Sequence, residues 1–136
     1  MNTRISKSIR LALLIFLATT GTAVAQDVAV VDSQTIGGEE LASRIEAETA
    51  PVILDVRSSE EFAEGHIPGA INIPHTQLED RYEELGIEAS DEVVVYCRTG
   101  PRAGIAEAAL KGLGFTNLRD LEGHIEAWKE AERPLE

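Results

Sequence analysis

The chain has 136 residues and carries 24 acidic side chains against 12 lysines and arginines, which gives a formal net charge of −12 at pH 7. This balance argues against nucleic acid or an anionic membrane as a partner, because both attract clusters of Lys and Arg. A solvated acidic surface that keeps the protein soluble accounts for the charge, and a salt-rich habitat would fit it as well.

The first 25 residues have the three parts of a secretory signal peptide. An apolar run, 11–18, precedes a small-x-small cleavage site, 23–25, and follows three positive residues, Arg4, Lys7 and Arg10. The apolar run is far shorter than the roughly 20 residues that cross a bilayer, so a retained membrane helix is the weaker interpretation. We expect cleavage after Ala25 and a periplasmic or secreted protein with no membrane contact, whose 111 remaining residues carry a net charge of −15 and form one domain.

Beyond the expected cleavage site, short β-branched runs alternate with longer amphipathic ones. The runs predicted as strands are 28–31, 52–55, 70–73, 93–96 and 117–121. The predicted helices are 39–48, 58–64, 77–85, 102–113 and 124–131. Ser58 and Glu61 have capping-box spacing, and Gly112 and Gly114 suit a helix end. The alternation predicts an α/β fold with a central parallel sheet and helices on both faces, in which ligands bind at the carboxyl ends of the strands.

Cys97 is the only cysteine in the chain, so an internal disulfide is impossible. A single thiol in an exported protein is an inert core residue, an intermolecular link or a reactive group. For a cysteine without further context the inert core residue is favoured, and nearby arginines are then ordinary surface charges. The residues around Cys97 decide among these interpretations.

Those residues favour a reactive thiol. The strand 93–96 leads into a loop that reads CRTGPR, and a helix is predicted to begin near Pro101, a residue suited to a first helical position. Gly100 permits a tight curl in which several amides can converge on the sulfur, namely those of Arg98, Thr99, Gly100, Arg102 and Ala103. Amides at a helix N-terminus and neighbouring arginines lower a thiol pKa to about 3.5 to 7.5. We therefore predict a nucleophilic thiolate at Cys97, with Arg98 and Arg102 attracting an anionic substrate.

Three segments, in this order, resemble the single-domain rhodaneses, a family of sulfurtransferases. The segment YCRTGPRA resembles the family's loop pattern C-x-x-G-x-R. A second segment, ILDVRSSEEFAEGHIPGAINIP, resembles its hallmark of D-V-R, then E-F, then G-H-I-P-G-A-x-N-I-P. The last segment, LEGHIEAWKEAERPL, resembles the family's closing helix, L-x-G-G-x-x-A-W. The resemblance implies a rhodanese domain over 26–136 with a five-stranded parallel sheet flanked by helices. It also implies that the Cys97 thiolate takes the outer sulfur of a donor such as thiosulfate, that sulfite leaves, and that cyanide, a thiol or a protein thiol accepts the sulfur. Neither a metal nor an organic cofactor is implied.

Further residues have less specific roles. His124 replaces the second glycine of the closing motif, and its ring either lies near the loop, or points to solvent or caps the helix. A hydrogen-bonded scaffold near the strand ends is expected from Asp55, Arg57, Glu61 and His66, and Arg57 is a candidate to face the pocket. His66 and His75 are not spaced as a zinc pair. Many thiosulfate sulfurtransferases carry two tandem domains, so a single domain predicts a more open pocket that could admit a protein acceptor.

Two alternative functions stay open. Cysteine phosphatases and arsenate reductases resemble rhodaneses in fold and use a similarly nested thiolate, but phosphatase loops read C-x5-R. The spacing from Cys97 to Arg102 is C-x4-R, which suits a single sulfur better than a tetrahedral oxyanion. A rhodanese-like module that only binds partners typically lacks the cysteine, whereas its presence here is compatible with a persulfide relay.

Overall fold

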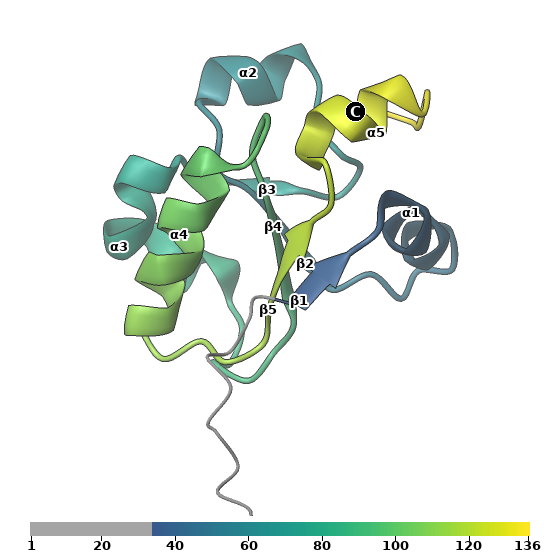
Figure 1. Ribbon diagram of the computed structural model, residues 1–136. Coiled ribbons are helices and arrows are strands. Elements are labelled where there is room, and N and C mark those ends of the chain that lie inside the picture. Colours follow the sequence, from purple (N-terminus) through teal and green to yellow (C-terminus); the bar gives the residue numbers. More distant parts are fainter. Residues whose placement is uncertain (1–33) are drawn as a thin grey trace, which may run out of the picture.

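The structure is a computed structural model in which residues 34–136 are described. Five parallel strands form one sheet in the order β1-β5-β4-β2-β3 (Figure 1). They are β1 (Gln34–Ile36), β2 (Val52–Asp55), β3 (Ile71–Asn72), β4 (Val93–Tyr96) and β5 (Leu118–Leu121). The expected signal peptide, 1–25, and the strand predicted at 28–31 lie outside the described residues. The predicted α/β class with a five-stranded parallel sheet is confirmed.

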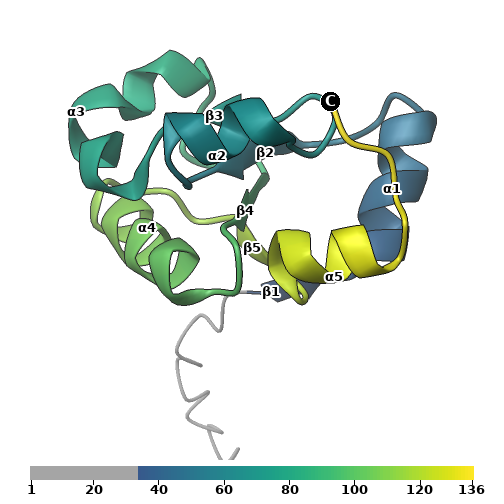
Figure 2. The ribbon, with the colours of Figure 1, turned by 90° about the horizontal axis from the view of Figure 1, so that it is seen from above.

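Helices cover both faces of this sheet. Figure 2 shows α1 (Gly38–Glu46) and α5 (His124–Glu130) on one side, with α3 (Leu78–Arg81) and α4 (Pro101–Gly112) on the other. The short helix α2 (Ser59–Glu64) lies across the end of the sheet at which β2 terminates (Figure 1). Within residues 34–136, no helix is long and apolar enough to cross a membrane.

The central strand β4 is buried on both faces. Val93, Val95 and Cys97 belong to the hydrophobic cluster that packs under α4, whereas Val94 and Tyr96 belong to the cluster under α5. This division follows from the alternation of side chains along a strand, which points successive residues to opposite faces. The apolar run 93–96 is therefore a buried parallel strand, as predicted, and Cys97 continues its alternation toward α4.

Element boundaries agree closely with the sequence prediction, with two differences. The helix predicted at 77–85 is a single α-helical turn, α3, between two 3-10 turns at His75–Gln77 and Tyr82–Leu85. Leu78 and Leu85 are nevertheless both buried, as the predicted helix required. Strand β1 is not among the predicted strands, since it has three residues of which only Ile36 is buried, and so it carries little apolar pattern.

Candidate functional site

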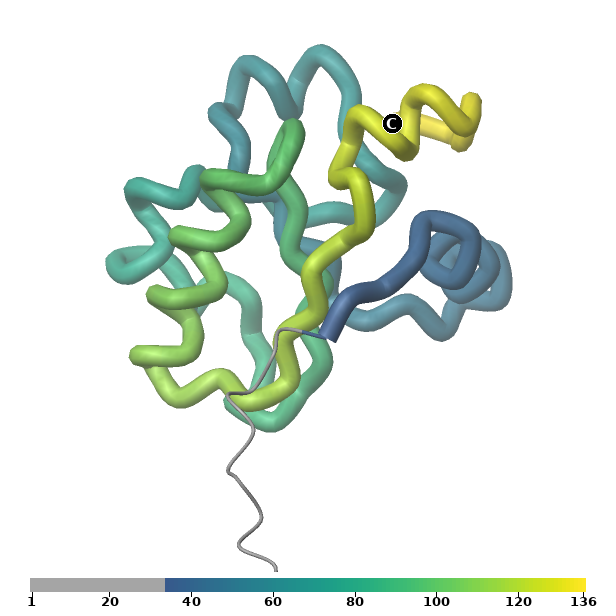
Figure 3. Tube along the Cα trace, in the orientation of Figure 1, coloured from purple at the N-terminus to yellow at the C-terminus, as the bar shows by residue number. Residues whose placement is uncertain are grey.

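The loop between β4 and α4 lies beside α2 and the first turn of α5 (Figure 3). Helix α4 begins with Pro101 at its first position, and Gly100 precedes it at φ 133°. That backbone angle is accessible to glycine and strained for residues with a Cβ. The predicted start of the helix and the predicted tight curl at Gly100 are therefore confirmed.

The sulfur of Cys97 lies inside this curl. The side chain is nearly fully buried, with 1% of the residue exposed, and its Sγ accepts a hydrogen bond from the amide of Gly100 at 3.0 Å. The amide of Ala103 also hydrogen-bonds the sulfur. Both amides belong to the set predicted to converge there, and they come from the N-terminal end of α4, where unpaired N–H groups favour negative charge.

These contacts activate the thiol. Burial alone raises the pKa of Cys97, but hydrogen bonds from His124 and from the amides of Ala103 and Gly100 outweigh burial and lower the pKa to about 7. A substantial fraction of the sulfur is then thiolate near neutral pH, and the thiolate is the nucleophilic form. Cys97 is thus buried, and its surroundings favour the ionised form of the thiol.

His124 lies against the loop, one of the two positions that the sequence left open. Its Nδ1 accepts a hydrogen bond from the backbone N–H of Cys97 at 3.2 Å, and its Nε2 is 3.6 Å from Oδ2 of Asp120. The residue is 5% exposed and has a φ of 52°, in the left-handed region. Asp120, at the end of β5, was not among the predicted site residues, because its only sequence signal is a position four residues before His124.

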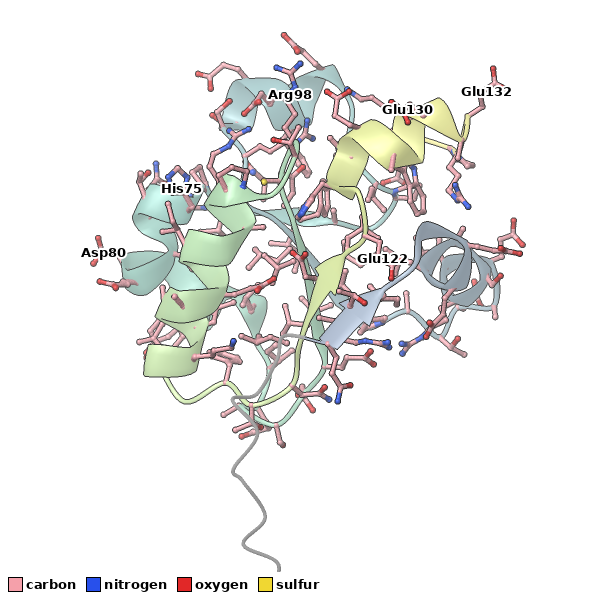
Figure 4. The ribbon with its side chains drawn as sticks, in the orientation of Figure 1. His75, Asp80, Arg98, Glu122, Glu130 and Glu132 are labelled. Atoms are coloured by element: carbon pink, nitrogen blue, oxygen red, sulfur yellow. The ribbon has the colours of Figure 1, made fainter. Side chains whose placement is uncertain are left out.

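The two loop arginines are both held by carboxylates. Arg102 donates from Nη1 and Nη2 to the two carboxylate oxygens of Glu61, at 2.6 and 3.0 Å. Arg98 donates from Nε to Glu126 at 2.8 Å, and its side chain is 66% exposed at the end of the molecule that carries α2 (Figure 4). Thr99 is exposed between them in the loop. The positive charge near the thiol is therefore partly neutralised, which sequence analysis did not anticipate.

A buried ion pair supports the strand ends beneath the loop. Arg57 donates from Nη2 to Asp55 at 2.7 Å and to the carbonyl of Gly65 at 2.8 Å, and the hydroxyl of Tyr96 donates to the same carboxylate at 2.7 Å. Arg57 is 3% exposed, so its guanidinium faces the interior and not the pocket. Because Tyr96 precedes Cys97, this network connects β2 to the strand that carries the thiol.

The other two residues of the expected scaffold bind elsewhere. Glu61 completes the capping box at the start of α2, where it accepts the N–H of Ser58 at 3.0 Å, and it also holds Arg102. The ring of His66 stacks on Phe62 with centroids 3.6 Å apart, and its Nε2 is 3.6 Å from the carboxylate of Glu136. Of the four residues expected to form a hydrogen-bonded scaffold, Asp55 and Arg57 bond to each other, whereas Glu61 and His66 have other partners.

Known proteins resemble the chain in sequence and in fold. Residues 38–131 match the model of the rhodanese-like domain. A sulfurtransferase of Allochromatium vinosum is 37% identical over 101 residues, which cover 74% of this chain and 92% of that protein. The thiosulfate sulfurtransferase PspE of Escherichia coli is 34% identical over 70 residues, 52% of this chain and 67% of that protein. A rhodanese-related protein from Thermoplasma volcanium has a crystal structure that covers 76% of this chain and 97% of its own, with a TM-score of 0.65 and 32% identity.

Other relatives are longer than the match. The chain spans 48% and 59% of the length of two Bacillus subtilis proteins, YrkF and YqhL. Two of the relatives are named as sulfurtransferases. Since the family match runs from α1 to α5 and includes four of the five strands and the loop around Cys97, the chain belongs to the rhodanese-like domain family.

Proposed function

We propose that this protein is a thiosulfate sulfurtransferase in which Cys97 carries the transferred sulfur as a persulfide. The observation that carries the proposal is the buried Sγ of Cys97, held by the Gly100 amide at 3.0 Å, with its pKa lowered to about 7. A thiolate in such a position is a nucleophile at neutral pH. The name of the Escherichia coli relative, thiosulfate sulfurtransferase, supports thiosulfate as the donor.

The reaction has two displacement steps. In the first, the Cys97 thiolate attacks the outer sulfur of thiosulfate, a sulfur–sulfur bond forms, and the old sulfur–sulfur bond breaks with its electron pair leaving on sulfite. In the second, cyanide or a thiolate attacks the outer sulfur of the persulfide and releases the Cys97 thiolate, as in thiol–disulfide exchange. The amides at the start of α4 stabilise negative charge on sulfur in both steps.

The acceptor and the compartment belong to the same proposal. Small thiols, cyanide and protein thiols are the acceptor classes that this chemistry accommodates. The signal-like segment 1–25 supports export to the periplasm or the outside, and a division into a cleaved segment 1–25 and a rhodanese domain 26–136 is compatible with a family match that begins at residue 38. N-terminal sequencing of the mature protein should begin at Gln26, whereas a mature protein that begins at Met1 would contradict export by cleavage.

The contacts of Arg102 disfavour the phosphatase alternative. A transferred phosphoryl group spreads its charge over three peripheral oxygens, each of which needs a donor. Arg102 makes a bidentate contact with Glu61, so its guanidinium is occupied by a carboxylate of the protein itself. Steady hydrolysis of an aryl phosphate that depends on Cys97, with no persulfide formed from thiosulfate, would overturn the sulfurtransferase assignment.

Intact mass spectrometry of protein purified without reductant, before and after incubation with thiosulfate, tests the proposal directly. Wild type should gain one sulfur atom from thiosulfate and lose it again when cyanide is added. Cys97→Ser should fold normally, because the substitution exchanges one small side chain for another, and should gain no sulfur. Thiosulfate-to-cyanide transfer by Cys97→Ser at the wild-type rate would show that the nucleophile lies elsewhere.

A further inference from the structure

We propose that His124, oriented by Asp120, takes the thiol proton of Cys97 and holds it as a counter-charge beside the sulfur. This adds a histidine and a carboxylate to a site whose nucleophile is otherwise activated by amides. The proton leaves Cys97 before any sulfur donor binds, so only the statements below about the persulfide rest on the proposed function.

The orientation of the imidazole ring is the first argument. Nδ1 faces Cys97 and accepts its backbone N–H at 3.2 Å, so this nitrogen carries a lone pair in the resting site. The proton of the neutral ring then lies on Nε2, which faces the Asp120 carboxylate at 3.6 Å. The ring also hydrogen-bonds the Cys97 side chain, so it lies between the thiol and the Asp120 carboxylate. A nucleophile, a base and a carboxylate beside the base form the arrangement that activates nucleophiles in unrelated enzymes.

The backbone at His124 is the second argument. Its φ of 52° lies in the left-handed region, where a residue with a Cβ is strained and a glycine is not. Such strain persists where the surrounding structure requires it, and it gathers at functional sites. Gly100 leaves room for the ring, because a Cβ there would lie 3.2 Å from Nε2. Two positions of the backbone are thus arranged so that an imidazole fits beside the loop.

The charges around the ring favour its protonated form. Asp120 at the end of β5, Cys97 in the loop and Glu107 in α4 all place negative charge near it. Burial opposes protonation, but the contact with Cys97 and the nearby carboxylates outweigh burial and raise the pKa of His124. The charge of Arg102 also attracts the negatively charged sulfur and so favours the thiolate, although its guanidinium is bound to Glu61. The contact between ring and thiol therefore lowers the pKa of Cys97 and raises that of His124, which favours the thiolate–imidazolium pair.

The proton is conserved through the cycle. The S–H bond of Cys97 breaks, an N–H bond forms at Nδ1, and the ring then donates to the thiolate in place of accepting from the backbone. Sulfur transfer from thiosulfate converts the thiolate into a persulfide anion without consuming this proton. The acceptor attacks as an anion and returns the thiolate, so the imidazolium stays beside a negatively charged sulfur at every stage.

Alkylation of Cys97 by iodoacetamide, followed against pH by intact mass, tests the proposal on the full chain. His124→Asn is the matched variant, because asparagine tolerates the left-handed backbone and its Oδ1 can accept the Cys97 N–H, yet it cannot be protonated. His124→Gly relieves the backbone strain and removes the ring altogether. The midpoint of the alkylation profile should rise by about one pH unit in both variants. His66→Asn is the control, because the His66 ring stacks on Phe62, and this variant should leave the midpoint unchanged.

The outcomes separate this proposal from the sulfurtransferase assignment. Coincident midpoints for wild type, His124→Asn and His124→Gly would overturn the role of His124, whether or not a persulfide forms. A raised midpoint in both variants, together with no mass gain from thiosulfate in wild type, would leave the proton transfer standing and overturn only the sulfur-transfer assignment.

Discussion

At the scale of single residues, the turn that leads into α5 depends on two consecutive left-handed positions. Gly123 has a φ of 69°, and a Cβ built on it would lie 2.3 Å from the Cβ of Ala127. Neither the backbone angle nor the contact tolerates a side chain. Gly123 thereby places the next residue, His124, against the loop that holds Cys97.

Gly123→Ala should destabilise the protein by about 2 kcal/mol or more, because the new methyl group meets Ala127 in a strained backbone. Gly104→Ala is the matched control, since Gly104 lies inside α4 with nothing within 4 Å of a built Cβ. That substitution should stabilise the protein by about 0.5 to 1 kcal/mol through helix propensity. Urea denaturation gives both values, and equal effects of the two substitutions would contradict the argument.

At the scale of elements, the loop is held from two sides. The contact of Arg102 with Glu61 joins the first turns of α4 and α2. On the other side, the amide of Ile125 donates to the carbonyl of Cys97 at 3.2 Å, so the first turn of α5 satisfies some of its unpaired N–H groups with the loop itself. The loop geometry therefore depends on the packing of three helices.

Glu61→Gln should weaken the connection between α2 and α4, and the loss should depend on pH. The hydrogen bond from Arg102 is the main cause that lowers the pKa of Glu61 to about 2, from an ordinary value of 4.5. A depressed carboxyl pKa contributes stability above the unfolded-state pKa and loses it as pH falls through the folded-state value. The free energy of unfolding of wild type should exceed that of Glu61→Gln by about 1 kcal/mol at pH 7, and the difference should shrink between about pH 5 and pH 2.

Urea titrations of both proteins at several pH values measure this difference. Glu60→Gln, next in the chain and without a contact to Arg102, is a suitable control and should show a small effect at all pH values. A difference between wild type and Glu61→Gln that stays constant down to pH 2 would contradict the ion pair as its source.

At the scale of the whole molecule, the site must bind an anion on an acidic protein. The chain has a net charge of −12, and the acidic residues labelled in Figure 4 lie over α3, over the end of α5 and after β5. Arg98 and Arg102, the two arginines of the loop that holds the thiol, are each bound to a glutamate. Long-range repulsion therefore opposes a small dianionic donor, and arginines already bound to glutamates offset little of this repulsion.

Salt should accordingly raise kcat/KM for thiosulfate, because ions screen the repulsion between exposed charges. Steady-state assays between about 10 and 200 mM potassium chloride, over which the Debye length falls from about 30 Å to below 10 Å, measure the effect. Alkylation of Cys97 by uncharged iodoacetamide is the matched control and should change little. A steep fall of kcat/KM with added salt would show that Arg98 and Arg102 attract the donor despite their glutamate partners.

The features that could be predicted from the sequence depend on signals between residues close together in the chain. The apolar run before Cys97, the proline and glycine that open α4 and the capping box at Ser58 each act within a few residues, so their structures follow from neighbours in the chain. The alternation of strands and helices was sufficient to predict a parallel sheet, because strands joined by crossover helices can be arranged in few other ways. The position of Cys97 at the end of a central strand, beside the start of a helix, could be predicted on these grounds.

The partners of the site residues were decided only by the tertiary structure. Glu126 and Glu61 lie 28 and 41 residues from the arginines that they bind, and no local pattern distinguishes them from the many other acidic residues. His124 had two open positions in the sequence, and it reaches Cys97 because β5 pairs with β4 and ends at the same edge of the sheet. The order of the strands in the sheet brings these distant residues together. The hydrophobic pattern along the chain indicates which residues are buried, but it does not indicate which residue each of them contacts.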